Sequence, residues 1–216
     1  MVIINRNCKL ISRFHYLTQD IPGVSHEELA EIACANGIRW VQLRVKNKPF
    51  GEWLQIAKNA RKITDKYNAS LIINDHPEIA LLSDADGVHL GKNDMPAGEA
   101  RKILGDGMII GGTANTLDDI LRLEKQGVNY IGLGPFRFTS TKKNLSPVLG
   151  LSGYEIVARH SPLVPVIAIG GIQIDDVQPL LQTGIHGLAV SSAINLSENK
   201  TDTIQAFLNQ FSLTSK

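Results

Sequence analysis

Short apolar segments alternate with stretches of helical periodicity along the whole chain, and this alternation restricts the fold more than any other feature of the sequence. The predicted strands cover residues 14–17, 39–43, 70–73, 87–90, 108–111, 130–134, 164–169 and 187–190. Several of these segments are almost continuously apolar, which is typical of strands that are covered on both faces. Strands that alternate with helices predict a parallel sheet with right-handed crossover connections.

The segments between the strands carry local signals for the beginning and end of helices. Ser25 and Glu28 have the spacing of a capping box at a helix N-terminus. Asn36-Gly37 is typical of a helix C-terminus, where the backbone turns into the left-handed conformation. These signals support helices as the connections between the strands.

The number and spacing of these units favour a closed barrel. Eight strand–helix units in 216 residues give about 27 residues each, the low end for a (β/α)8 barrel. An open doubly wound sheet is the main alternative, but no G-x-G-x-x-G follows the first predicted strand. Since no linker or change of composition divides the chain, we predict an α/β fold with a single TIM-barrel domain over residues 1–216, its core at about residues 13–211.

Composition and charge exclude several classes of function. The formal net charge is +1, so the overall charge does not favour nucleic acid or an anionic membrane as a partner. Cys8 and Cys34 fit no metal-binding or C-x-x-C spacing and are expected to be free thiols. No apolar run approaches 18 residues and no signal-peptide pattern is present, so we expect a cytoplasmic protein.

Polar side chains extend the second predicted strand toward the end of the barrel where active sites lie. Side chains alternate faces along a strand, so Gln42, Arg44 and Lys46 share one face and Leu43 and Val45 share the other. If the apolar face meets the helices, the polar triplet points toward the barrel mouth and could bind an anion. The alternative is that the strand has already ended and these are solvated loop charges.

Acidic residues follow the third and fourth predicted strands. Asn74-Asp75 and Asp94 could be turn formers or helix caps, the usual roles of such residues at strand ends. Adjacent strands can also bring Asp75 and Asp94 together, and beside a pyrophosphate two carboxylates predict a Mg²⁺ site. We expect His89, within the fourth strand, to be a packed or hydrogen-bonded barrel residue and not a ligand.

The loop after the sixth strand combines hydroxyl and ammonium groups. Its residues Thr139, Ser140, Thr141, Lys142 and Lys143 are suited to bind a phosphate, and solvated lysines are the alternative. The length and polarity of the segment 136–149 also predict a lid over the substrate.

Glycines and small hydroxylic residues follow the fifth, seventh and eighth strands. Thr113 offers a hydroxyl after Gly111-Gly112. Gly171 lies after the seventh strand, and Ser191 and Ser192 lie after the eighth. In a TIM barrel the last two positions are the usual place for a phosphate held by backbone N–H groups, although glycines also serve tight turns.

These motifs together resemble those of thiamine-phosphate synthases, in order and in spacing, from about residue 14 to residue 211. The motifs are Gln42-x-Arg44-x-Lys46, Asn74-Asp75, Gly91-x-x-Asp94, Thr139-x-Thr141-Lys142-Lys143, Ile169-Gly170-Gly171-Ile172 and Val190-Ser191-Ser192-Ala193-Ile194. The resemblance implies a (β/α)8 barrel and a Mg²⁺-dependent transferase of thiamine biosynthesis. Such an enzyme joins 4-amino-2-methyl-5-hydroxymethylpyrimidine diphosphate to a thiazole phosphate, and releases thiamine monophosphate and pyrophosphate.

The resemblance also implies roles for individual residues. Contacts to the pyrimidine diphosphate are implied for Gln42, Arg44, Lys46, Asn74, Thr113 and Lys142, with Arg44, Lys46 and Lys142 stabilising the leaving group. Asp75 and Asp94 are implied as the metal ligands, and Thr139, Thr141, Gly171, Ser191 and Ser192 as the site of the thiazole phosphate, with Ser140 as a further substrate-binding residue. The chain departs from the common pattern at Val45, Asn115 and Arg137-Phe138, and has Thr113 where serine is common.

Two other functions remain as alternatives. One is a thiazole tautomerase of the same superfamily, in which a histidine is expected where this chain has Asn115. The other is a non-catalytic protein that binds thiamine phosphates, which would not need two metal carboxylates. The sequence leaves open the oligomeric state and whether the preferred thiazole carries a carboxylate.

Overall fold

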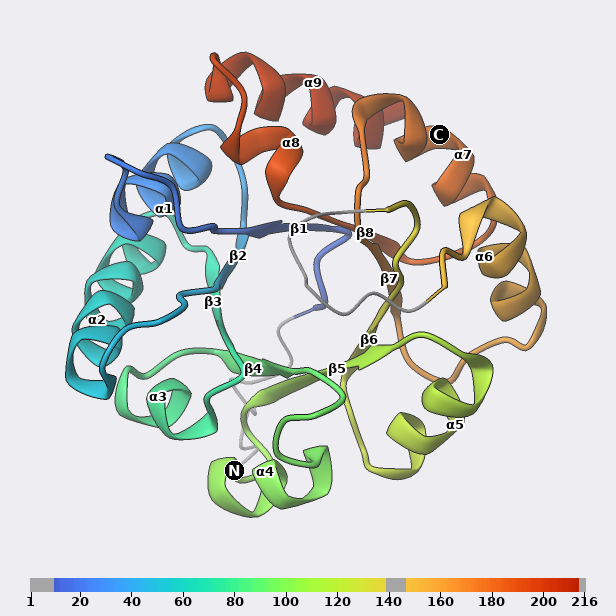
Figure 1. Ribbon diagram of the computed structural model, residues 1–216, viewed down its shortest axis with the longest axis horizontal. Coiled ribbons are helices and arrows are strands. Elements are labelled where there is room, and N and C mark those ends of the chain that lie inside the picture. Colours follow the sequence, from blue (N-terminus) through green and yellow to red (C-terminus); the bar gives the residue numbers. More distant parts are fainter. Residues whose placement is uncertain (1–9, 139–146, 214–216) are drawn as a thin grey trace, which may run out of the picture.

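The computed structural model describes residues 10–138 and 147–213, and in these residues eight parallel strands close into a barrel (Figure 1). The strands are β1 (Phe14–Leu17), β2 (Trp40–Leu43), β3 (Ser70–Asn74), β4 (Gly87–Leu90), β5 (Ile109–Ala114), β6 (Tyr130–Leu133), β7 (Val166–Ile169) and β8 (Gly187–Val190). Each strand pairs with the next along the chain, and β8 closes on β1 with Leu188 opposite Phe14. The predicted TIM barrel is therefore confirmed, and the extent of the domain over residues 1–216 stays a prediction.

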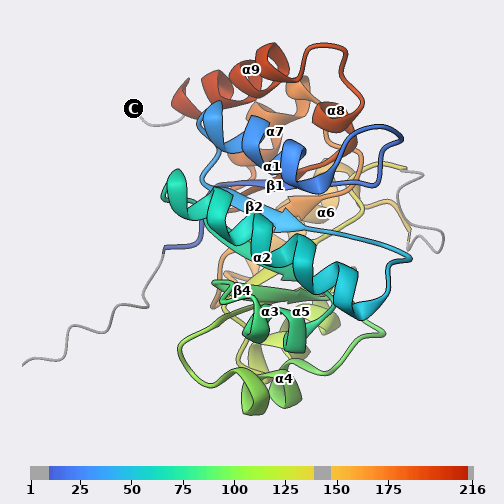
Figure 2. The same ribbon diagram turned by 90° about the vertical axis from the view of Figure 1, so that its left-hand side faces the viewer.

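Helices surround the barrel on its outside (Figure 1). They are α1 (His26–Ala35), α2 (Phe50–Lys66), α3 (Pro77–Leu82), α4 (Ala97–Leu104), α5 (Leu117–Lys125), α6 (Gly150–Arg159), the 3-10 helix η1 (Ile174–Asp176), α7 (Val177–Gln182), α8 (Ser192–Asn195) and α9 (Lys200–Leu213). Figure 2 shows α1 and α2 side by side on one flank, with α9 at one end of the view and α4 at the other. None of the described helices has both the length and the apolar composition needed to cross a membrane.

Side-chain alternation along the strands divides the buried residues into two layers. Leu43, Val45 and Leu71 belong to the large outer cluster between the sheet and the helices. A smaller inner cluster, which includes Trp40 and Tyr130, fills the barrel interior. Because successive side chains point to opposite faces, a strand buried on both sides must be apolar at nearly every position, as the sequence indicated.

Most predicted boundaries agree with the structure, and β5 is the clearest exception. The sequence pattern predicts a strand that ends at Gly111, whereas β5 continues to Ala114. Gly111 and Gly112 lie within the strand, and the absence of side chains there leaves room for packed neighbours. A Cβ at Gly111 would lie 2.2 Å from Tyr130 Cζ, and a Cβ at Gly112 would lie 2.6 Å from Leu123 Cδ2. The glycine pair is therefore a packing feature and not a turn.

The local helix signals were also informative. The Ser25 side chain accepts a hydrogen bond of 3.0 Å from the Glu28 N–H at the start of α1. Asn36 caps the end of the same helix, and Gly37 has a φ of +100°. Cys34 in this helix is a buried free thiol, as expected, whereas Cys8 lies outside the described residues.

Gly111→Ala is expected to lower the free energy of unfolding by about 1–3 kcal/mol, because overpacking of a filled core forces rings off their rotamers. The added methyl group would collide with the buried ring of Tyr130. Denaturant unfolding measures the effect. Gly98→Ala is the matched control, since nothing lies within 4 Å of a Cβ at this position in α4. Equal stabilities of the two variants would contradict the packing explanation.

Candidate active site

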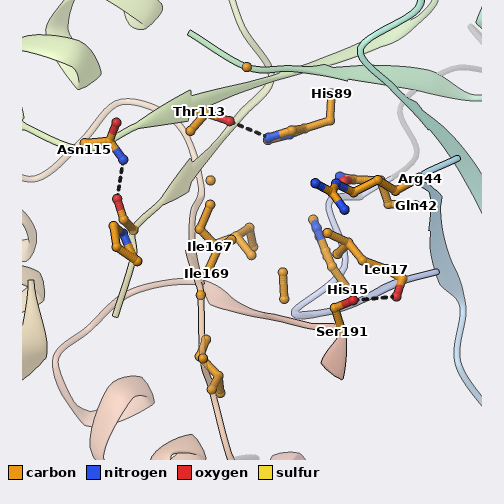
Figure 3. A pocket seen from close by; sticks show the side chains of 18 of the residues that line it. His15, Leu17, Gln42, Arg44, His89, Thr113, Asn115, Ile167, Ile169 and Ser191 are labelled. Carbon is orange, nitrogen blue, oxygen red and sulfur yellow. Dashed lines mark hydrogen bonds between the residues drawn. The ribbon is translucent and has the colours of Figure 1, made fainter. Parts of the chain in front are cut away.

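A cavity of about 540 Å³ opens at the carboxyl ends of the strands. Each strand, or the segment directly after it, contributes to the lining. In Figure 3 Gln42 and Arg44 lie on one side of this cavity, and Thr113 and Asn115 lie on the other. The position agrees with the general location of active sites in TIM barrels.

Most of the predicted site residues that the structure describes meet in this cavity. They are Gln42, Arg44, Asp75, Asp94, Thr113, Gly171, Ser191 and Ser192. Asn74 is buried at the end of β3, Lys46 is exposed beyond β2, and neither belongs to the lining. Thr139, Ser140, Thr141, Lys142 and Lys143 lie outside the described residues, as does most of the predicted lid.

Arg44 lies just beyond the end of β2, and Thr18 fixes its backbone. The Arg44 N–H donates to Thr18 Oγ1 at 3.0 Å, and the Thr18 N–H donates to the carbonyl of Gln42 at 3.0 Å. Gln42 and Arg44 line the cavity while Val45 is buried with the outer layer, so the predicted alternation continues beyond the strand end. Burial lowers the pKa of Arg44, and the charges of Asp75 and Asp20 oppose that shift. The result is a half-buried guanidinium group directed at the cavity.

Asp75 and Asp94 supply the carboxylates of the lining. Asp75 has a φ of +68°, and its N–H donates to the carbonyl of His89 at 2.8 Å. One carboxylate oxygen of Asp94, Oδ2, accepts from the N–H of Gly91 at 2.7 Å. A Cβ at Gly91 would lie 2.7 Å from that oxygen, so glycine is needed for this close approach. No group of three or more His, Cys, Asp or Glu residues able to hold a metal occurs in the described part of the chain.

An ion-pair network borders the cavity on the side of β4 and β5. Lys92 lines the cavity and pairs with Asp119 at 2.7 Å, and Asp119 also accepts from the N–H of Asn115 at 3.0 Å. Burial alone would raise the pKa of Asp119, but the bonds from Lys92 and from the Asn115 backbone lower it. The Asn115 side chain donates to the carbonyl of Gly134. Asp119 therefore ties two loops of the cavity rim together.

The ends of β7 and β8 form the glycine and serine part of the lining. Gly170 and Gly171 have φ values of +94° and +70°, and a Cβ at Gly171 would lie 3.0 Å from the carbonyl oxygen of Phe138. The Ser191 hydroxyl donates to the carbonyl of Leu17 at 3.2 Å (Figure 3). Together, these residues form the part of the cavity lining at the ends of β7 and β8.

The sequence interpretation missed a cluster of aromatic rings inside the barrel, of which His15 and Tyr130 line the cavity and Trp40 does not. His15 stacks on Trp40 with 4.3 Å between ring centroids, and the edge of Tyr130 packs against both. Burial lowers the pKa of His15 well below its usual value. Side-chain alternation along the strands could have indicated this cluster. It places His15 on the same face as Leu17, and Trp40 on the same face as Gln42, toward the barrel interior.

His89 is a hydrogen-bonded barrel residue, as expected. Its ring nitrogens lie 3.0 Å from the hydroxyl oxygens of Tyr130 and Thr113. The sequence did not indicate these partners, because Tyr130 and Thr113 come from different strands.

Comparisons with known proteins identify the family of the chain. A family model described as thiamine monophosphate synthase matches residues 16–194. A thiamine-phosphate synthase of Bacteroides fragilis is 43% identical over 198 residues, covering 90% of this chain and 97% of that protein. A thiamine-phosphate synthase of Flavobacterium johnsoniae is 51% identical over 177 residues, covering 80% of this chain and 84% of that protein. The solved structure of thiamine phosphate pyrophosphorylase from Pyrococcus furiosus matches with a TM-score of 0.86 at 32% identity, covering 94% of this chain and 97% of that one. The chain therefore belongs to the thiamine-phosphate synthase family.

Proposed function

We propose that this protein joins the pyrimidine diphosphate to a thiazole phosphate in the cavity, with Mg²⁺ as cofactor, and releases thiamine monophosphate and pyrophosphate. The observation that carries the proposal is the convergence of one guanidinium group, two carboxylates and the glycine–serine ends of β7 and β8 on a single cavity. A cavity of about 540 Å³ lies within the range of small-molecule sites.

The two phosphate-bearing substrates are assigned to opposite parts of the cavity. Arg44, Gln42 and Thr113 would contact the pyrimidine diphosphate, with Lys46, Asn74 and Lys142 as further proposed contacts. Gly171, Ser191 and Ser192 would hold the thiazole phosphate, with Thr139, Ser140 and Thr141 completing that site. Backbone N–H groups of these residues would donate to phosphate oxygens, and the two serine hydroxyls, which donate to the Leu17 carbonyl and to the Gln19 side chain in this structure, would exchange those partners for the phosphate.

Asp75 and Asp94 are the proposed ligands of Mg²⁺, and their chemistry fits that ion. Mg²⁺ prefers hard oxygen ligands and is usually held by one or two carboxylates, with water and substrate phosphate oxygens completing the shell. Both carboxylates line the cavity, and the bond from the Gly91 N–H to Asp94 engages Oδ2 and not Oδ1. Bound there, the ion would neutralise charge on the diphosphate leaving group.

The proposed reaction requires the chain to stabilise a departing anion. Arg44 would form charge-assisted hydrogen bonds to the diphosphate oxygens, and these strengthen as the bond to the pyrimidine methylene carbon breaks. The pyrophosphate keeps the electron pair of that bond. The amino-pyrimidine supports the resulting positive charge, and the thiazole nitrogen then captures the cation. Ser191 and Ser192 would act by orienting the thiazole phosphate for this attack.

Asn115 favours this synthase reaction over the tautomerase alternative. A tautomerase must move a proton at carbon, for which an imidazole at this position would be suited. The amide of Asn115 has no comparable acid–base function, and its nitrogen already donates to the carbonyl of Gly134.

The test is turnover by the purified protein with both substrates and Mg²⁺. We expect equal amounts of pyrophosphate and thiamine monophosphate, and no product when either substrate is omitted. Chelation by EDTA is expected to reduce the rate to background, and added Mg²⁺ should restore it. Isomerisation of the thiazole phosphate alone would identify a tautomerase, and tight binding of thiamine phosphate without turnover would identify a binding protein.

A further inference from the structure

We infer that Tyr130 and His89 are positioning residues that fix the Thr113 hydroxyl as a hydrogen-bond donor to a ring nitrogen of the bound pyrimidine. The inference rests on the proposed function, because it concerns the recognition of the pyrimidine substrate. It adds two residues and a direction of hydrogen bonding to that site.

A continuous hydrogen-bond chain connects the three side chains. The Tyr130 hydroxyl lies 3.0 Å from His89 Nδ1. On the other side of the ring, His89 Nε2 lies 3.0 Å from Thr113 Oγ1 (Figure 3). Burial raises the pKa of Tyr130, and hydrogen bonding from the Gln42 side chain opposes that shift. All four residues line the cavity and none is more than 7% exposed. Polar groups with so little exposure are generally satisfied by hydrogen-bond partners, which here are the neighbouring side chains.

The number of hydrogens in the chain determines its direction. When the Gln42 amide nitrogen donates to the Tyr130 oxygen, the single hydroxyl hydrogen of Tyr130 is directed to His89 Nδ1. Neutral imidazole then carries its hydrogen on Nε2 and donates it to Thr113 Oγ1. The hydrogen of the Thr113 hydroxyl is therefore directed away from His89. Since Thr113 lines the cavity, that hydrogen is available to a ligand.

The packing of the barrel holds the two rings in place. His89 and Tyr130 are the register partners of Gly111 on its two sides. A Cβ at Gly111 would lie 2.2 Å from Tyr130 Cζ, and a Cβ at Gly132 would lie 3.0 Å from His89 Cε1. Glycine at both positions therefore gives the rings the space they occupy. This arrangement is preorganised, so little further ordering is needed when a ligand binds.

A fixed donor distinguishes the parts of the pyrimidine ring. A ring nitrogen has a lone pair that accepts from Thr113, whereas a C–H group or the exocyclic amino group does not match a donor. A ligand that leaves the buried Thr113 hydroxyl without an acceptor loses binding free energy. The chain therefore selects a ring with nitrogen at the position opposite Thr113.

The experiment compares three ligands: the pyrimidine diphosphate and two analogues in which one or the other ring nitrogen is replaced by C–H. Binding is measured by calorimetry with Mg²⁺ and without thiazole phosphate. For the unmodified protein we expect one analogue to bind about 10-fold more weakly than the parent, the equivalent of one hydrogen bond. In Tyr130→Phe, which keeps the ring, this difference should fall to about twofold or less.

Further variants separate positioning from general loss of structure. His89→Asn also breaks the link to Thr113 and should lose the same discrimination, as should Thr113→Val. Thr113→Ser restores the hydroxyl and should keep it. Tyr154→Phe is the matched control: it removes another buried hydroxyl, which donates to the Leu133 carbonyl at 2.7 Å outside the cavity lining. This variant should retain the full difference between the ligands.

The inference is overturned if Tyr130→Phe and His89→Asn keep the discrimination that Thr113→Val loses. It is also overturned if the unmodified protein binds all three ligands equally. Failure of the unmodified protein to bind the parent diphosphate at all would instead overturn the proposed function, and the inference with it.

Discussion

Asp75→Asn is expected to lower kcat by about 100- to 1,000-fold, the usual loss when one electrostatic stabiliser of a transition state is removed. Asp75 lines the cavity and is a proposed Mg²⁺ ligand, and a neutral amide binds that ion more weakly than a carboxylate. The substitution by asparagine matters because Asp75 has a φ of +68°. Asparagine tolerates this conformation, whereas alanine would add backbone strain that is unrelated to the metal.

Steady-state kinetics over a range of Mg²⁺ concentrations measures this effect, and thermal unfolding verifies the fold. The variant should need more Mg²⁺ for half-maximal rate. Asp84→Asn is the matched control, since Asp84 is also an aspartate with positive φ, +54°, but is exposed and absent from the cavity lining. Full activity of Asp75→Asn at low Mg²⁺ would refute the metal role of this carboxylate.

Arg44→Lys is expected to lower kcat/KM for the pyrimidine diphosphate by about 10- to 100-fold although the charge is retained. A guanidinium group binds phosphate oxygens with two parallel N–H donors, and an ammonium group cannot reproduce this geometry. Arg44 is also half-buried, so its charge is poorly screened by water and its interaction with an anion is strengthened. Arg44→Gln, which removes the charge, should lose more than Arg44→Lys.

Initial rates at saturating thiazole phosphate measure this prediction. Arg39→Lys is the control on the same segment, because Arg39 is exposed and donates to the carbonyls of Cys34 and Ile38, outside the cavity lining. Kinetic constants of Arg39→Lys should equal those of the unmodified protein. An equal loss of kcat/KM in both variants would mean that Arg44 supports the stability of the fold and does not bind the diphosphate.

The barrel could be predicted because each strand carries its own signal. A segment that is buried on both faces must be apolar at successive positions, and a helix needs a different period, so the order of elements is visible along the chain. The end of β5 was not predictable in this way. The predicted strand stops at Gly111, and only the side chains of Tyr130 and Leu123 that pack against the two glycines explain why it continues to Ala114.

The candidate site was predictable where a residue directly follows a strand. Arg44, Asp75 and Ser191 meet in the cavity because parallel strands all end at the same rim of the barrel. Lys46 was harder to place: the alternation continues past the end of β2 at Leu43 as far as Val45, but Lys46 is exposed and does not line the cavity.

For this chain, the order of its residues was sufficient to determine the barrel and the rim on which its polar groups gather. That information is local, since it depends on periodicity within one segment and on the few residues directly after that segment. The partners of each side chain were decided only by the tertiary structure: Asp119 with Lys92, and His89 with Tyr130 and Thr113. These contacts join different segments of the chain, and they depend on strand register and on the space that glycine leaves beside a ring, which no single segment specifies.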